Sequence, residues 1–191
     1  AAVAQATQRL RLCTDVSPLP RYHPAVLART LVGLDLLSGG RVTVGLGAGV
    51  DFDFHPLDPA STPKVRAAML DEGLDLLAAL VAGEPVTLHG AFYHAEQVQL
   101  APAAVQQPRI PFWIGGDSPP AYRRAARWDG WVIGGVDEQQ QVTMTPAQLG
   151  ERVAAIRGHR TQPGTFDVAV SGCTDAAGLA STGERLVPAY A

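Results

Sequence analysis

The segment 34–49, with the sequence LDLLSGGRVTVGLGAG, constrains the fold of this chain more than any other part of it. It contains the end of a helix, a two-glycine break, a short apolar strand, and further glycines where that strand opens into a loop. Ligands of α/β proteins gather at the carboxyl ends of parallel strands, where glycine lets a cofactor approach the backbone closely. Two later strands also end in glycine pairs, so the sequence predicts a cofactor site.

Strand and helix patterns alternate along the chain, which is typical of a parallel sheet with crossover helices. The longest expected helix carries the apolar residues Leu70, Leu74, Leu77 and Val81 at the spacing of one buried face. The expected strands comprise residues 9–16, 41–47, 110–114, 130–133 and 166–171, and the expected helices comprise residues 1–8, 24–37, 63–82, 118–127 and 146–158. Residues 51–62 are expected to form an irregular loop, residues 84–102 a small β excursion of two strands, and the tail the start of another helix.

The glycines of GLGAG do not fit a dinucleotide-binding fold. Their spacing is G-x-G-x-G instead of G-x-G-x-x-G, and the following segment 50–56 does not begin a helix. A dinucleotide pyrophosphate needs a helix N-terminus directly after the glycines. We therefore favour a (βα) barrel over a doubly wound sheet.

The composition excludes several classes of function. Hydrophobic residues make up 47% and charged residues 17% of the 191 residues, as in a globular protein. The net charge of −3 argues against nucleic acid as a partner, and no apolar run approaches the roughly 20 residues of a membrane span. We find no signal-peptide pattern and expect a cytoplasmic protein, in which Cys13 and Cys173 are free thiols.

The spacing of the histidines and arginines does not by itself predict a metal site or a second anion site. The histidines at positions 23, 55, 89 and 94 show no metal-ligand spacing with a supporting carboxylate, so we expect no metal site. Arg123, Arg124 and Arg127 fall on one expected helix, where we favour a solvated face over contact with a phosphate.

Five segments in order resemble the luciferase-like monooxygenase family. They are RLRLCTDVSPLPRYHPAVLARTL, LDLLSGGRVTVGLGAG, VRAAMLDEGLDLLAALVAGEPVTLHGAFYH, AVQQPRIPFWIGG and RRAARWDGW, and together they cover most of the chain. The resemblance implies a (βα)8 TIM barrel of the bacterial-luciferase type and an oxidoreductase that uses a flavin or deazaflavin. Within the family the chain looks closest to members that use coenzyme F420, with FMN as the alternative.

The resemblance also numbers the strands. The first expected strand would be the family's third and residues 166–171 its seventh. Residues 1–191 would then form a single luciferase-like barrel domain, truncated at both ends and holding about strands 3 to 7. Five strands cannot close such a barrel, so we expect a fragment of a longer protein, with a reduced short relative as the alternative.

The same resemblance implies which residues contact the ring of the cofactor. Asp15 and Val16 would face the isoalloxazine-like ring, at the place where the family has a non-prolyl cis peptide. Ala48 and Gly49 would lie beside the ring or the ribityl chain. The structural alternatives are a plain strand end with Asp15 as a turn former, and a tight strand-to-helix turn. Asp51 is one residue away from the position of the family's acidic proton donor, which leaves that role open.

The cofactor phosphate is expected near a second group of glycines. Gly115, Gly116 and Ser118 lead into a helix whose positive end and backbone N–H groups favour an anion, and Gly134 is a neighbouring candidate. The negative charge of Asp117 argues against a phosphate, and Ser118 has an alternative role as a helix cap.

The function implied by the resemblance is hydride transfer between coenzyme F420 and a small organic substrate. The alternatives are an FMN-dependent monooxygenase and a non-catalytic, flavin-binding reduced barrel. Family members are frequently dimers, so a homodimer is the assembly implied. We name no catalytic residue, because the family's acidic and histidine groups often come from a strand that this sequence lacks.

Overall fold

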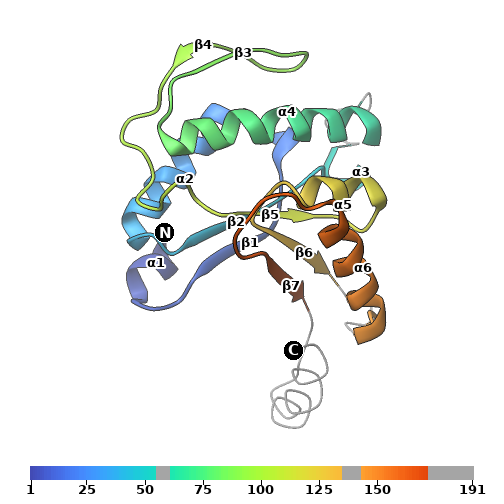
Figure 1. Ribbon diagram of the computed structural model, residues 1–191. Coiled ribbons are helices and arrows are strands. Elements are labelled where there is room, and N and C mark those ends of the chain that lie inside the picture. Colours follow the sequence, from blue (N-terminus) through green and yellow to red (C-terminus); the bar gives the residue numbers. More distant parts are fainter. Residues whose placement is uncertain (55–60, 135–142, 172–191) are drawn as a thin grey trace. The chain divides into compact units, whose positions relative to one another are not determined.

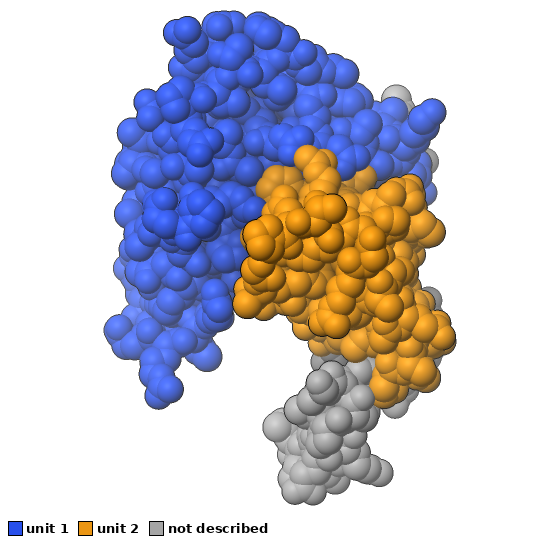
Figure 2. Space-filling view, in the orientation of Figure 1, with its two compact units in different colours: residues 1–115 blue, residues 116–191 orange. Residues whose placement is uncertain are grey.

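The computed structural model describes residues 1–54, 61–134 and 143–171. It divides into two compact units, Ala1–Gly115 and Gly116–Ala191, which are coloured separately in Figure 2. The expected helix in the tail lies outside the described residues, as do His55, Gly135 and Cys173.

The first unit contains a parallel sheet in the order β1, β2, β5 (Figure 1). Its strands are β1 (Leu12–Pro18), β2 (Val42–Gly47) and β5 (Phe112–Gly115). Val44 of β2 is in register with Thr14 of β1 and with Phe112 of β5. The register between β1 and β2 shifts between Thr14 and Ser17, so the carboxyl end of β1 departs from regular pairing.

Helices of the first unit begin and end at the expected kinds of residue. They are α1 (Ala2–Ala6), the 3-10 helix η1 (Leu19–Arg21), α2 (Pro24–Ser38), α3 (Asp51–Phe54) and α4 (Pro63–Ala82). Both α2 and α4 start with proline in the first turn and end at a glycine with positive φ, Gly39 at 67° and Gly83 at 76°. The expected face of α4 is confirmed, since Leu70, Leu74, Leu77 and Val81 are all fully buried.

The expectation of an irregular loop over residues 51–62 is wrong at its beginning, because Asp51–Phe54 form the short helix α3. The side chain of Asp53 accepts a hydrogen bond from the Val50 N–H at 2.9 Å and so satisfies a donor at the start of this turn. Phe54 is buried, and Arg66 of α4 lies over its ring at 4.9 Å from the centroid. Tertiary contacts therefore support a helix too short to be recognised from periodicity.

A two-stranded antiparallel hairpin lies beside α4 (Figure 1). It consists of β3 (Val86–His89) and β4 (His94–Val98). Glu72 of α4 accepts hydrogen bonds from the backbone N–H groups of Ala91, Phe92 and Tyr93 at 3.0, 3.0 and 2.6 Å. One carboxylate thus holds the turn of the hairpin against the helix.

The second unit contains a pair of parallel strands and two helices. They are α5 (Pro119–Ala125), β6 (Gly130–Gly134), α6 (Pro146–His159) and β7 (Asp167–Ser171), with Trp131 of β6 in register with Val168 of β7. A capping box between Thr145 and Gln148 begins α6. The interpretation of all three arginines near α5 as solvated is wrong for Arg124, which is buried and only 8% exposed.

Among the described residues, no helix combines the length and the hydropathy that a membrane crossing requires.

Candidate cofactor site

The side chain of Val16 packs over glycines of β2 and β5, near the carboxyl ends of these strands. A Cβ atom at Gly45 or Gly115 would lie 3.1 Å from Val16 Cγ1, and one at Gly47 would lie 3.3 Å from Val16 Cγ2. Any larger residue at these positions would displace the valine side chain. Val16 itself is 38% exposed. Val16 and these glycines therefore form an apolar surface of the first unit, called the platform below, against which a planar ring could pack.

The residue before this platform is Asp15, which is exposed. The peptide bond between Asp15 and Val16 is cis, the conformation that the family resemblance implies at this place. Asp15 also acts on the neighbouring thiol. Partial burial, followed by the negative charge of Asp15, raises the pKa of Cys13 above its ordinary value.

Ala48 and Gly49 follow β2 and are half-buried. Gly49 has a φ of 75°, and a Cβ atom there would lie 2.6 Å from the Phe54 ring and 2.8 Å from Pro18 Cβ. Glycine is thus required for the turn itself, which agrees with the tight-turn alternative and leaves a cofactor contact as a proposal. The carboxylate of Asp51 is held by Arg66, whose Nη2 lies 2.6 Å from Asp51 Oδ1.

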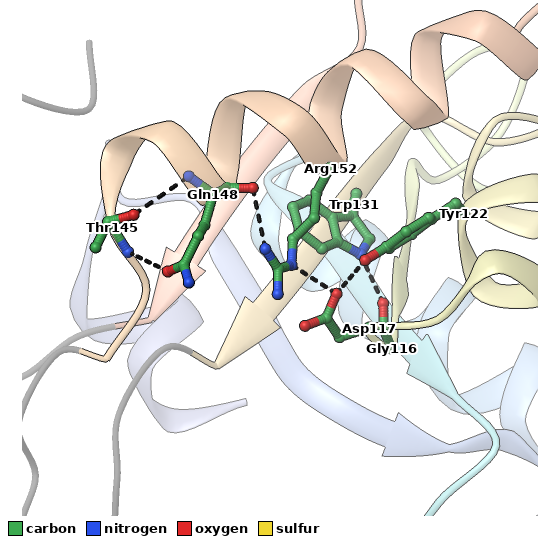
Figure 3. Close-up of polar contacts among 7 residues, drawn as sticks. All are labelled: Gly116, Asp117, Tyr122, Trp131, Thr145, Gln148 and Arg152. Atoms are coloured by element: carbon green, nitrogen blue, oxygen red, sulfur yellow. Dashed lines mark hydrogen bonds and ion pairs between the residues drawn. The ribbon is translucent and has the colours of Figure 1, made fainter.

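In the second unit, a polar network surrounds the loop that carries Gly116 and Ser118 (Figure 3). Arg152 of α6 donates from Nε to Asp117 Oδ1 at 2.8 Å, and the Tyr122 hydroxyl donates to the same oxygen. Trp131 of β6 donates from its ring N–H to the Gly116 carbonyl at 2.9 Å. The loop is therefore tied to α5, β6 and α6 at once.

The charge of Asp117 is compensated within this network. The hydrogen bond from Arg152 holds the pKa of Asp117 below its usual range, and the bond from Tyr122 acts in the same direction while partial burial opposes both. Burial and the neighbouring Asp117 raise the pKa of Tyr122, so its hydroxyl keeps the proton that it donates. The anion that argued against a phosphate at this loop is thus paired with a cation.

Ser118 and Gly134 are both accessible. Ser118 precedes α5, but its side chain makes no capping hydrogen bond. The capping alternative for Ser118 is thereby not realised. Pro119 and Pro120 occupy the first turn of α5 and have no N–H, so the helix end itself offers few donors. Gly134 ends β6, is exposed, and would accept a Cβ atom without a contact within 4 Å.

The structure thus groups the predicted residues in two sets. Asp15, Val16, Ala48, Gly49 and Gly115 belong to the first unit, with Val16 in contact range of Gly115. Gly116, Ser118 and Gly134 belong to the second unit. Sequence reasoning missed Arg152 and Tyr122, because no local pattern relates Arg152 to a carboxylate 35 residues earlier in the chain.

The sequence is similar to known proteins over most of its length. The sequence matches the luciferase-like monooxygenase family over residues 1–177. It is 33% identical over 164 residues to an uncharacterised protein of Mycobacterium tuberculosis, an alignment that covers 86% of this chain and 53% of that protein. It is 37% identical over 136 residues to the F420-dependent glucose-6-phosphate dehydrogenase of Beutenbergia cavernae, covering 69% of this chain and 39% of that enzyme. The chain therefore spans about half or less of the length of these relatives.

The fold is likewise shared with solved structures. The crystal structure of the monooxygenase RslO1 from Streptomyces bottropensis matches with a TM-score of 0.74 and 26% identity, over 99% of this chain and 58% of that one. The expected α/β TIM-barrel fold of the bacterial-luciferase type, present here in part, is confirmed.

Proposed function

Because the chain belongs to the luciferase-like monooxygenase family, we propose that it is part of an oxidoreductase that transfers a hydride between coenzyme F420 and a small organic substrate. A relative that covers 69% of the chain at 37% identity is named as F420-dependent, which favours this cofactor over FMN. The observation that carries the proposal is the platform of Val16 over Gly45, Gly47 and Gly115 at the carboxyl edge of the first unit's sheet. Family members place a ligand at that edge of a barrel.

The residues of the first unit would bind and orient the ring. The exposed isopropyl group of Val16 would pack against one face of it, and Asp15, Ala48 and Gly49 would contact its edge or the ribityl chain. The deazaflavin, when bound, supplies the hydride chemistry, and the protein supplies position and exclusion of water. Val16 is suited to that task because an apolar contact orients a flat ring without offering a proton.

For the second unit taken by itself, a phosphate site is a separate proposal. Gly116 offers close backbone approach, Ser118 offers a hydroxyl that is not used as a cap, and Gly134 leaves open space at the end of β6. Arg152 brings a positive charge to the same loop, where it also neutralises Asp117. Arginine is suited to phosphate because its planar fork presents several donors at once.

The proposal is tested by titrating the purified chain with F420 and with FMN in parallel, following ligand fluorescence. We expect F420 to bind more tightly. Val16→Asp should weaken F420 binding at least tenfold, because it places a charge against the ring face. Val26→Asp on α2 is the matched control, since Val26 is 62% exposed and lies on a helix, outside the strands that form the platform. Equal losses in both variants, or no binding of F420, would overturn the ring assignment.

The phosphate assignment has a separate test. Arg152→Ala should weaken the binding of inorganic phosphate several-fold, and the loss should shrink at high salt because the interaction is ionic. Arg157→Ala, in the exposed last turn of the same helix, should leave the affinity unchanged. A result in which both arginine variants bind like the wild type would remove Arg152 from the site.

The structural match to a monooxygenase supports one alternative, an FMN-dependent monooxygenase. A clear preference for FMN in the parallel titration would replace the F420 proposal by this one. A protein that binds either cofactor tightly but turns over no substrate in its full-length form would instead be the non-catalytic binder.

A further inference from the structure

We propose that the β3–β4 hairpin binds a divalent transition-metal ion such as Zn²⁺ through the Nδ1 atoms of His89 and His94. Glu96 serves as the partner of the His89 ring. This site is separate from the cofactor platform and does not depend on the proposed function. It departs from the expectation, based on histidine spacing alone, that the chain has no metal site.

The distance between the two nitrogens fits a tetrahedral metal. His89 Nδ1 and His94 Nδ1 face each other at 3.3 Å. With a metal–nitrogen distance of about 2.0–2.1 Å, two ligands at the tetrahedral angle lie about 3.3–3.4 Å apart. The ring planes are tilted by 53° and the centroids are 4.8 Å apart, so the rings do not stack. A metal ion can replace the shared proton between the two nitrogens with little movement of the rings.

Glu96 completes an arrangement that is common around metal-binding histidines. Its Oε2 lies 3.4 Å from His89 Nε2, on the far side of the ring from the ligating nitrogen. A carboxylate near Nε2 favours the proton on that nitrogen, which leaves the lone pair of Nδ1 for a metal. One ligand atom from each of the three residues lies within 4.8 Å of the others. The carboxylate also offsets part of the charge of a divalent cation.

The hairpin holds these side chains in place through its backbone. His89 and His94 are direct cross-strand partners, and Glu96 follows His94 by two residues, so all three share one face of the hairpin. The turn between the histidines is held by Glu72, and a Cβ atom at Gly90 would collide with that carboxylate. Little further conformational entropy is therefore lost when the two histidines bind a metal.

The site is open to solvent, which determines what it can do. His89 and Glu96 have side chains that are 62% and 61% exposed, so water would fill the remaining coordination positions. Two imidazoles with water favour borderline metals such as Zn²⁺, Ni²⁺ and Cu²⁺ over Mg²⁺ or Ca²⁺, which prefer oxygen ligands. We therefore expect selective binding of moderate affinity and no structural requirement for the metal.

The test is calorimetric titration of the metal-free, untagged chain with Zn²⁺, in a Cys13→Ser/Cys173→Ser background that removes the thiols. We expect one Zn²⁺ per chain, and at least tenfold weaker binding in His89→Gln and in His94→Gln. Glu96→Gln should weaken binding by about tenfold, the usual effect of losing a partner of a ligating histidine. His159→Gln, which changes an exposed histidine at the end of α6, is the matched control and should bind like the background protein.

Two results would overturn the proposal. One is the absence of Zn²⁺ binding up to about 1 mM, and the other is equal affinity in the background protein and the His89→Gln/His94→Gln double variant. Equal affinity in Glu96→Gln alone would remove Glu96 from the site. Thermal melts without metal serve as the folding control, because the exposed substitutions should leave the melting temperature unchanged.

Discussion

The neighbouring strands β1 and β2 are parallel and hydrogen-bonded to each other, yet they differ in exposure along almost their whole length. Every residue of β2 is buried, whereas residues 13–16 of β1 are all exposed. The strand β2 lies between β1 and β5, while within the described residues of the first unit β1 pairs with β2 alone. We infer that β2 contributes more to the stability of the fold, and that β1 provides the surface available for a ligand.

The two strands meet at the glycines of β2, and the largest expected effect is there. In Gly45→Ala the new Cβ atom would collide with the backbone carbonyl of Thr14, so the strands would have to separate. We expect the free energy of unfolding to fall by about 3 kcal/mol or more, measured by urea denaturation. The control is Gly33→Ala in α2, where no atom lies within 4 Å and a helix should gain about 0.5–1 kcal/mol. Similar values for the two variants would contradict the close approach of β1 and β2.

The next largest effect is a difference between the two strands in the loss of unfolding free energy when a side chain is shortened. Leu46 of β2 is fully buried, and Leu46→Ala should lower the free energy of unfolding by about 2–5 kcal/mol. Val16 of β1 is 38% exposed, and Val16→Ala should cost less than about 1 kcal/mol while still weakening F420 binding. A cost for Val16→Ala equal to that of Leu46→Ala would show that β1 is as important to the core as β2.

A smaller effect should follow from a side chain that bonds across the pair. Thr14 Oγ1 donates to the Gly45 carbonyl and accepts from the Gly45 N–H, both at 3.1 Å. Thr14→Val keeps the shape and removes both bonds, so we expect a loss of about 1–2 kcal/mol. Thr30→Val is the control, because the exposed Thr30 bonds its own helix at Val26. The same loss in both variants would indicate that the cross-strand bonds contribute nothing specific.

The smallest effect concerns chemistry on β1. Partial burial of the thiol and the charge of Asp15 raise the pKa of Cys13, so less thiolate is present at neutral pH than in an ordinary cysteine. Alkylation of Cys13 by iodoacetamide should be slow at neutral pH and reach half its maximal rate at a higher pH than in the urea-unfolded chain, in a Cys173→Ser background. Asp15→Asn should move that midpoint down and speed the reaction.

The raised pKa of Cys13 also makes the stability of the fold depend on pH. The folded state holds the Cys13 proton more tightly than the unfolded chain, so this contribution is complete below the pKa of the unfolded chain and is lost as the pH rises through the folded-state pKa. A midpoint of alkylation at or below that of the unfolded chain would contradict the raised pKa of the Cys13 thiol.

The local features of this protein were determined by its sequence. Prolines and glycines at the ends of α2 and α4 set the limits of those helices, because proline fits the first turn and glycine the left-handed end. Apolar spacing identified the buried face of α4, since helical periodicity acts within a few turns. The family motifs likewise predicted the fold, because they follow one another along the chain in the order of the barrel's strands and helices.

Only the tertiary structure decided which distant side chains meet. The helix α3, the burial of Arg124, the pair of Asp117 with Arg152, and the cluster of His89, His94 and Glu96 each depend on contacts that short-range spacing does not encode. In the hairpin, cross-strand register converts an ordinary histidine spacing into two facing nitrogens. In the second unit, the position of α6 brings a cation to a carboxylate far away in the sequence. Helix ends depend on local backbone conformation, whereas sites depend on where the folded backbone places side chains.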